Sequence, residues 1–200
     1  MEWYEAEVQN LERLQASNPL PAGCILFYGS SSIRLWMTLE QDFPDFPVAN
    51  RGFGGSTMAA CSWFFWRLVL PLKPRSLVVY AGDNDLGDGQ PPAEVLRQFG
   101  FLASQIDEFL GYIPFAFISI KPSPARWHLR DHICEVNAAI ERHLNGRPNG
   151  LFINVFEKML SGGYPRTEFF ATDGLHLSPA GYRLWKEVLW SYREQLFSIS

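Results

Sequence analysis

Cysteine, long apolar runs and clustered basic residues are all scarce in this 200-residue sequence. The only cysteines are Cys24, Cys61 and Cys134, an odd number whose spacing matches no CxxC or zinc pattern. Two of them lie in apolar stretches. We therefore expect buried, reduced thiols in a reducing compartment rather than a disulfide framework.

The apolar runs are too short for a membrane protein. No stretch reaches the roughly 18 consecutive apolar residues of a membrane span, and the richest, at residues 63–66, is ended by Arg67. The N-terminus carries Glu2, Glu5 and Glu7 and lacks the apolar centre of a signal peptide. The sequence therefore predicts a cytoplasmic protein without a membrane span.

The charge is mildly acidic and evenly spread. There are 17 basic and 21 acidic residues, a formal net charge of −4, and no group of Lys and Arg marks a phosphate-binding face. This argues against nucleic acid as a partner. There is no internal repeat and no linker, so we expect one domain over residues 1–200. No pattern in the sequence predicts an oligomeric state.

Strands and helices are predicted to alternate along the whole chain. Short apolar runs predict strands at residues 24–28, 48–50, 77–80, 114–120 and 151–155. Longer apolar or periodic stretches predict helices at residues 3–16, 57–70, 95–109, 133–144 and 178–196, the last beginning at a Ser178-Pro179 cap. This alternation indicates an α/β fold, in which helices cover both faces of a mostly parallel sheet.

Residues that can take part in catalysis or ligand binding follow three of the predicted strands. They lie at 29–32 (GSSS), 50–56 (NRGFGGS) and 82–85 (GDND). Ligands of such sheets bind at the carboxyl ends of the strands, so we expect these three segments to share one site.

The first segment suits a nucleophilic serine. Where a strand turns into a helix, the free N–H groups of the first helical turn lie beside the hydroxyl and can face a substrate carbonyl. Two other interpretations stay open here: a serine-rich helix cap, and a phosphate-binding loop of a flavin or nucleotide protein. The segment lacks the GxxxxGK[ST] and GxGxxG patterns, which disfavours the phosphate loop.

The other two segments carry groups that can stabilise a developing negative charge. Asn84 can donate a hydrogen bond from an uncharged amide, and the glycines in residues 52–55 let backbone N–H groups approach a ligand closely. An Asx-rich turn is the structural alternative at residues 82–85. A calcium loop is a further one, with Asp83, Asp85 and Glu94 at positions 1, 3 and 12, but the residues between them fit that loop poorly.

An aspartate and a histidine lie three residues apart just before the last predicted helix. In a tight turn the carboxylate of Asp173 can bond the imidazole of His176, fix its tautomer and stabilise the imidazolium form. A histidine with a purely structural role is the alternative. The other histidines, His128, His132 and His143, lie on or near a helical face and are interpreted as surface residues.

These segments together resemble the ordered blocks of the SGNH hydrolase superfamily, also called GDSL esterases and lipases. Residues 27–31, 50–56, 82–84 and 173–176 resemble its four blocks and span most of the chain in the right order. In this comparison Ser31 has the place of the nucleophile. The family's Gly-Asp-Ser is Gly29-Ser30-Ser31 here, which leaves Ser32 as the alternative nucleophile.

The resemblance implies a three-layer α/β/α sandwich with a five-stranded parallel sheet, of the flavodoxin-like SGNH type. It also implies a serine esterase in which Ser31, His176 and Asp173 form the triad. The N–H groups of Ser31 and Gly55 and the side chain of Asn84 then form the oxyanion hole.

The partner implied by the resemblance is a small-molecule ester with a short, acetyl-like acyl chain, and no cofactor or metal is called for. Thioester hydrolysis and carbohydrate deacetylation use the same machinery and remain alternatives. A catalytically silent binding module of the same fold is an alternative from another class.

Overall fold

A five-stranded parallel sheet lies at the centre of the computed structural model, which describes residues 1–21 and 23–197. The strand order is β2-β1-β3-β4-β5, and every neighbouring pair is parallel. The strands are β1 (Ile25–Gly29), β2 (Val48–Gly52), β3 (Ser76–Tyr80), β4 (Phe115–Ile118) and β5 (Gly150–Ile153). The predicted α/β fold with a five-stranded parallel sheet is therefore confirmed.

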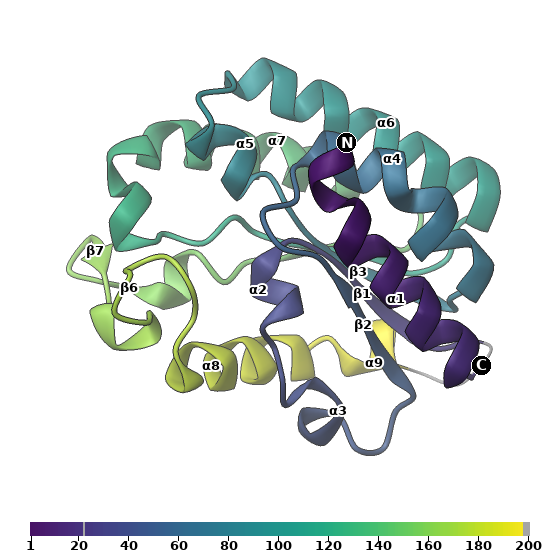
Figure 1. Ribbon diagram of the computed structural model, residues 1–200. Coiled ribbons are helices and arrows are strands. Elements are labelled where there is room, and N and C mark those ends of the chain that lie inside the picture. Colours follow the sequence, from purple (N-terminus) through teal and green to yellow (C-terminus); the bar gives the residue numbers. More distant parts are fainter. Residues whose placement is uncertain (22, 198–200) are drawn as a thin grey trace.

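Helices form a layer on each face of this sheet (Figure 1). The layer on one face consists of α1 (Glu5–Ser17), α4 (Met58–Leu68), α6 (Pro92–Leu110) and α7 (Arg130–Asn145). The other layer consists of α2 (Ser31–Arg34), α3 (Leu39–Asp42), α8 (Pro179–Trp190) and α9 (Arg193–Leu196). Because both faces are covered, β1, β3 and β4 are buried at every residue, and their sequences are mostly apolar.

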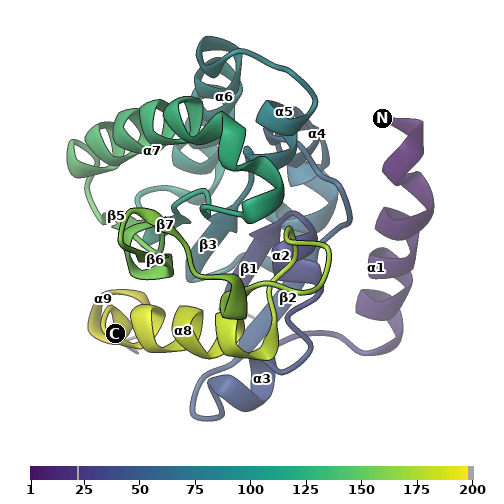
Figure 2. The same ribbon diagram turned by 90° about the vertical axis from the view of Figure 1, so that its left-hand side faces the viewer.

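Shorter elements surround the carboxyl ends of the strands. Helix α5 (Asp83–Gly87) follows β3, and a hairpin of β6 (Leu160–Ser161) and β7 (Tyr164–Pro165) lies between β5 and α8. Figure 2 views the molecule from this side. Short 3-10 helices occur at Glu2–Tyr4, Leu70–Leu72, Pro124–Leu129, Glu157–Met159 and Thr167–Phe169.

The predicted long helices and strands are found close to their predicted bounds. One correction concerns residues 178–196, which form two helices because the chain turns at Ser191 and Tyr192. Ser178 caps α8 as predicted, since its Oγ accepts a hydrogen bond from the N–H of Gly181 at 3.2 Å. Helices α2, α3 and α5 were not delimited from the sequence, because four or five residues are too few to show a period.

None of the helices within residues 1–21 and 23–197 combines the length and the apolar composition that a membrane span requires.

Candidate active site

Ser31 is the first residue of α2, directly after the turn that leaves β1. Gly29, the last residue of β1, has φ +129°, and a Cβ there would lie 2.0 Å from the carbonyl oxygen of Tyr80, so this position requires glycine. Ser30 and Ser32 are buried, whereas Ser31 is half-buried. Of the three hydroxyls, the one that a substrate can reach is therefore that of Ser31.

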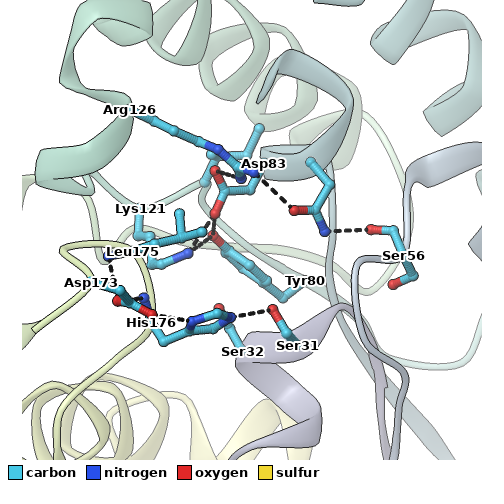
Figure 3. A network of polar contacts seen from close by, with 12 residues as sticks. Ser31, Ser32, Ser56, Tyr80, Asp83, Lys121, Arg126, Asp173, Leu175 and His176 are labelled. Atoms are coloured by element: carbon cyan, nitrogen blue, oxygen red, sulfur yellow. Dashed lines mark hydrogen bonds and ion pairs between the residues drawn. The ribbon is translucent and has the colours of Figure 1, made fainter. Parts of the chain in front are cut away.

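The structure brings Ser31, His176 and Asp173 together in a row, here called the serine row (Figure 3). His176 Nε2 lies 3.1 Å from Ser31 Oγ, and His176 Nδ1 lies 2.6 Å from Asp173 Oδ2. An ionised carboxylate only accepts hydrogen bonds, so Nδ1 carries the proton and Nε2 is left to accept one from the Ser31 hydroxyl. This is the arrangement in which an imidazole acts as a general base toward a serine.

The turn at residues 173–176 holds the carboxylate of Asp173 in place. Its Oδ1 accepts hydrogen bonds from the backbone N–H groups of Leu175 at 2.8 Å and His176 at 2.9 Å. The hydrogen bond from the His176 side chain, together with these two, lowers the pKa of Asp173 to about 2. The carboxylate is therefore ionised at neutral pH, although its side chain is 49% exposed.

Asn84 lies near the start of α5, and two other segments fix its side chain. Its Nδ2 donates to the carbonyl oxygen of Ser56 at 3.0 Å, and its Oδ1 accepts from Arg126 at 3.1 Å. One N–H of the amide then remains for a further acceptor. Gly82, the residue before α5, has φ +98°, a conformation that favours glycine.

Gly55 lies in an exposed turn between β2 and α4. It has φ +68°, and no atom of the described residues lies within 4 Å of where its Cβ would be. The hydroxyl of Tyr4, near the start of α1, donates to its carbonyl oxygen at 3.1 Å. The N-terminal helix thus supports this turn, and open space remains on the side where a substituent would project.

A second polar group, here called the ion cluster, consists of Tyr80, Asp83, Lys121 and Arg126 and lies beside the serine row (Figure 3). Asp83 Oδ2 lies 2.5 Å from Lys121 Nζ and 3.1 Å from the Tyr80 hydroxyl, and Asp83 Oδ1 lies 2.6 Å from Arg126. Burial raises the pKa of Asp83, but the two cations lower it more, so the net shift is downward. The side chains of Asp83 and Lys121 are only 4% and 2% exposed.

Sequence reasoning did not foresee the ion cluster. From the sequence, Asp83 is interpreted only as part of an Asx-rich turn or of a calcium loop. A signal was available, because two cations follow β4 at the same sheet edge where an aspartate follows β3.

The three carboxylates that the calcium interpretation requires contact different partners instead of facing a common point. Asp83 pairs with two cations, Asp85 accepts from the N–H of Met58 at 3.0 Å, and Glu94 pairs with Arg97 at 2.6 Å. Over residues 1–21 and 23–197, no three or more His, Cys, Asp or Glu side chains group as metal ligands. The calcium interpretation therefore has no support in the fold.

Burial raises the pKa of Asp85 to about 6, since it lacks the nearby cations that Asp83 has.

The remaining histidines and cysteines lie as the sequence suggested. His128, His132 and His143 are exposed. Cys24 and Cys61 are buried free thiols, and Cys134 is an exposed one.

Comparison with known families identifies the family of this chain. The family model described as GDSL-like Lipase/Acylhydrolase matches residues 27–184, which include the serine row and the ion cluster. The chain belongs to this family. It is thus an SGNH-type hydrolase that acts on esters. A search of curated proteins found no match.

Solved structures share the fold at low sequence identity. A protein from Streptococcus pneumonia described as a platelet activating factor is 21% identical, with a TM-score of 0.83 over 94% of this chain and 92% of that one. A GDSL-like lipase from Bacteroides thetaiotaomicron is 22% identical, with a TM-score of 0.77 over 94% and 98%. A family 3 carbohydrate esterase from Clostridium thermocellum is 16% identical, with a TM-score of 0.66 over 85% and 95%.

Proposed function

We propose that this protein is a serine esterase that hydrolyses carboxylic esters with short acyl chains through Ser31, His176 and Asp173. The observation that carries the proposal is the serine row: an accessible hydroxyl 3.1 Å from an imidazole whose other nitrogen lies 2.6 Å from a carboxylate. Membership of an acylhydrolase family supports the same reaction class.

The first half of the reaction forms an acyl-enzyme. Ser31 Oγ attacks the ester carbonyl carbon while His176 Nε2 takes the hydroxyl proton. Asp173 accepts the hydrogen bond from Nδ1 and stabilises the imidazolium. The tetrahedral intermediate then breaks its bond to the alcohol oxygen, which receives the proton from Nε2 and leaves.

The second half repeats these steps with water. His176 Nε2 removes a proton from the water as its oxygen attacks the acyl carbon. The bond to Ser31 Oγ breaks, the proton returns to that oxygen, and the carboxylic acid is released.

Three N–H groups are proposed to bind the oxyanion. The N–H of Ser31 begins α2, where a helix provides no acceptor for it. The N–H of Gly55 belongs to the exposed turn, and Asn84 contributes the amide N–H that is not bonded to Ser56. Such donors act on the charge that appears only in the transition state.

The acetyl-like acyl group is the finer part of the proposal. The relatives with solved structures include a carbohydrate esterase and an acetyl-xylooligosaccharide esterase, both 16% identical to this chain. The name of the second specifies an acetyl group on a sugar, which favours a short acyl chain.

Labelling with a fluorophosphonate probe tests the nucleophile, because such probes react with activated serines. We expect the wild type to be labelled, with the modified peptide containing Ser31, and Ser31→Ala to be neither labelled nor active on p-nitrophenyl acetate. Ser32→Ala is the matched control and should keep both properties. An unlabelled wild type would support the binding module instead. Undiminished turnover by Ser31→Ala would rule out Ser31 as the nucleophile.

A substrate panel tests the acyl preference. The panel contains p-nitrophenyl esters of increasing chain length, an acetyl thioester and an acetylated oligosaccharide. The proposal expects kcat/KM to be highest for acetyl among the p-nitrophenyl esters and higher for oxygen esters than for the thioester. A maximum at long chains or with the thioester would overturn this part.

A further inference from the structure

The guanidinium group of Arg126 lies between a carboxylate oxygen of Asp83 and the amide oxygen of Asn84. One of its nitrogens is 2.6 Å from Asp83 Oδ1, and another donates to Asn84 Oδ1 at 3.1 Å. The Arg126 side chain is only 16% exposed. Asp83 is itself held by Lys121 and Tyr80, so the arginine is anchored on a rigid, buried partner.

This contact determines which way the amide of Asn84 faces. With Oδ1 against the guanidinium and one N–H on the carbonyl oxygen of Ser56, the second N–H is free for an oxyanion. A flipped amide would bring its NH2 group against the guanidinium donors and its oxygen against the Ser56 oxygen. It would also present an acceptor, rather than a donor, to the developing negative charge.

We propose that Arg126 is a positioning residue for the oxyanion hole, which acts by holding the amide of Asn84 in its donating orientation. This inference rests on the proposed function, because it assigns a role within the same reaction. Arg126 is not proposed to touch the reacting atoms. Its guanidinium group forms an ion pair with Asp83 and donates a hydrogen bond to Asn84 at the same time, which the single ammonium group of a lysine does not reproduce.

Gly87 makes the position of the guanidinium possible. It lies at the end of α5, and a Cβ there would be 2.6 Å from the guanidinium carbon of Arg126. Gly87→Ala should therefore displace the guanidinium without removing any polar group. The backbone of Gly87 lies outside the left-handed region, so alanine is compatible with it.

The experiment is a double-mutant cycle between Arg126→Lys and Asn84→Ala, with kcat and KM measured on p-nitrophenyl acetate. We expect Asn84→Ala to lower kcat by about 10²–10³-fold, the usual effect of losing one oxyanion donor. Arg126→Lys should lower kcat by a large part of that factor, with KM changed less than threefold. In the Asn84→Ala background the arginine substitution should have no further effect on kcat.

Gly87→Ala provides an independent test that does not alter the charges. It should also lower kcat. Gly100→Ala in α6, where no atom of the described residues lies within 4 Å of the added Cβ, should leave kcat unchanged. If Arg126→Lys fails to fold, the Gly87→Ala and Gly100→Ala pair still decides the question.

Two results would overturn the inference while the proposed function stands. Independent effects of Arg126→Lys and Asn84→Ala on kcat would show that the arginine does not act through the amide. An unchanged kcat in both Arg126→Lys and Gly87→Ala would do the same. Failure of the proposed function looks different, because the wild type itself would then lack esterase activity.

Discussion

The serine row and the ion cluster lie next to each other, but the serine row is much more exposed to water. In the serine row, the side chains of His176 and Asp173 are 32% and 49% exposed. In the ion cluster, the side chains of Lys121 and Asp83 are 2% and 4% exposed. Both contain a carboxylate close to a nitrogen, so the difference lies in burial rather than in the kind of contact.

Burial decides what each group can do. An exposed pair contributes little to stability, since water solvates either partner alone, and its charge can change during a reaction at little cost. A buried pair is strongly interdependent, because removal of one partner leaves the other charge without solvent or counterion. We infer that the serine row moves protons while the ion cluster maintains fixed charges and positions.

The largest expected effect comes from Asp173→Asn in the serine row. An asparagine amide can place an N–H against Nδ1 of His176, which moves the imidazole proton to Nε2 and prevents it from accepting the Ser31 proton. We expect kcat to fall by about 10⁴-fold, while the free energy of unfolding changes by less than about 1 kcal/mol. Steady-state kinetics and urea unfolding check the two values. A large loss of stability with an unchanged kcat would show that Asp173 has a structural role and not a catalytic one.

Asp83→Asn in the ion cluster should cause a large loss of stability. It leaves the ammonium of Lys121 and the guanidinium of Arg126 without their shared anion. We expect the free energy of unfolding to fall by about 3–5 kcal/mol, measured by urea unfolding. Asp88→Asn, at an exposed aspartate next to α5, is the matched control and should change stability by less than about 0.5 kcal/mol. Equal losses of stability in Asp83→Asn and Asp88→Asn would mean that burial does not decide how much a carboxylate contributes to stability.

Asp85 sharpens the comparison, because it is buried two residues from Asp83 but forms no ion pair with any residue of 1–21 and 23–197. Its pKa is raised to about 6, so the folded state binds its proton more tightly than the unfolded state does. This contribution to stability is complete below about pH 4 and is lost as pH rises through about 6, a change of about 3 kcal/mol. The difference in unfolding free energy between the wild type and Asp85→Asn should decrease by this amount over that range. A difference independent of pH would contradict the assignment.

The smallest expected effect concerns a neutral hydrogen bond beside the serine row. The hydroxyl of Tyr182 in α8 donates to the carbonyl oxygen of Ser32 in α2 at 3.0 Å. Tyr182→Phe should lower the free energy of unfolding by about 1 kcal/mol, as for a typical hydrogen bond. Tyr192→Phe, whose hydroxyl lies 3.5 Å from its acceptor, is the control and should cost less. The reverse order in urea unfolding would show that this bond does not support α2.

The sequence allowed the main elements to be predicted because their signals are local. The run Leu77–Tyr80 is apolar throughout, as a strand covered on both faces must be, and β3 contains it. In α6, Val95, Phe99, Leu102 and Ile106 recur at helical spacing and are all buried. Short helices such as α5 lack such a period, and tertiary contacts determine them.

By itself, therefore, the sequence determined the parallel sheet, the strand ends at which Ser31, Gly55 and Asn84 lie, and the three-residue spacing of Asp173 and His176. Only the tertiary structure decided which serine of residues 30–32 is accessible and which carboxylates are paired. It also decided that a lysine and an arginine after β4 meet an aspartate after β3. These properties depend on side chains from distant segments and on the exclusion of water between them, and no local pattern of residues records either.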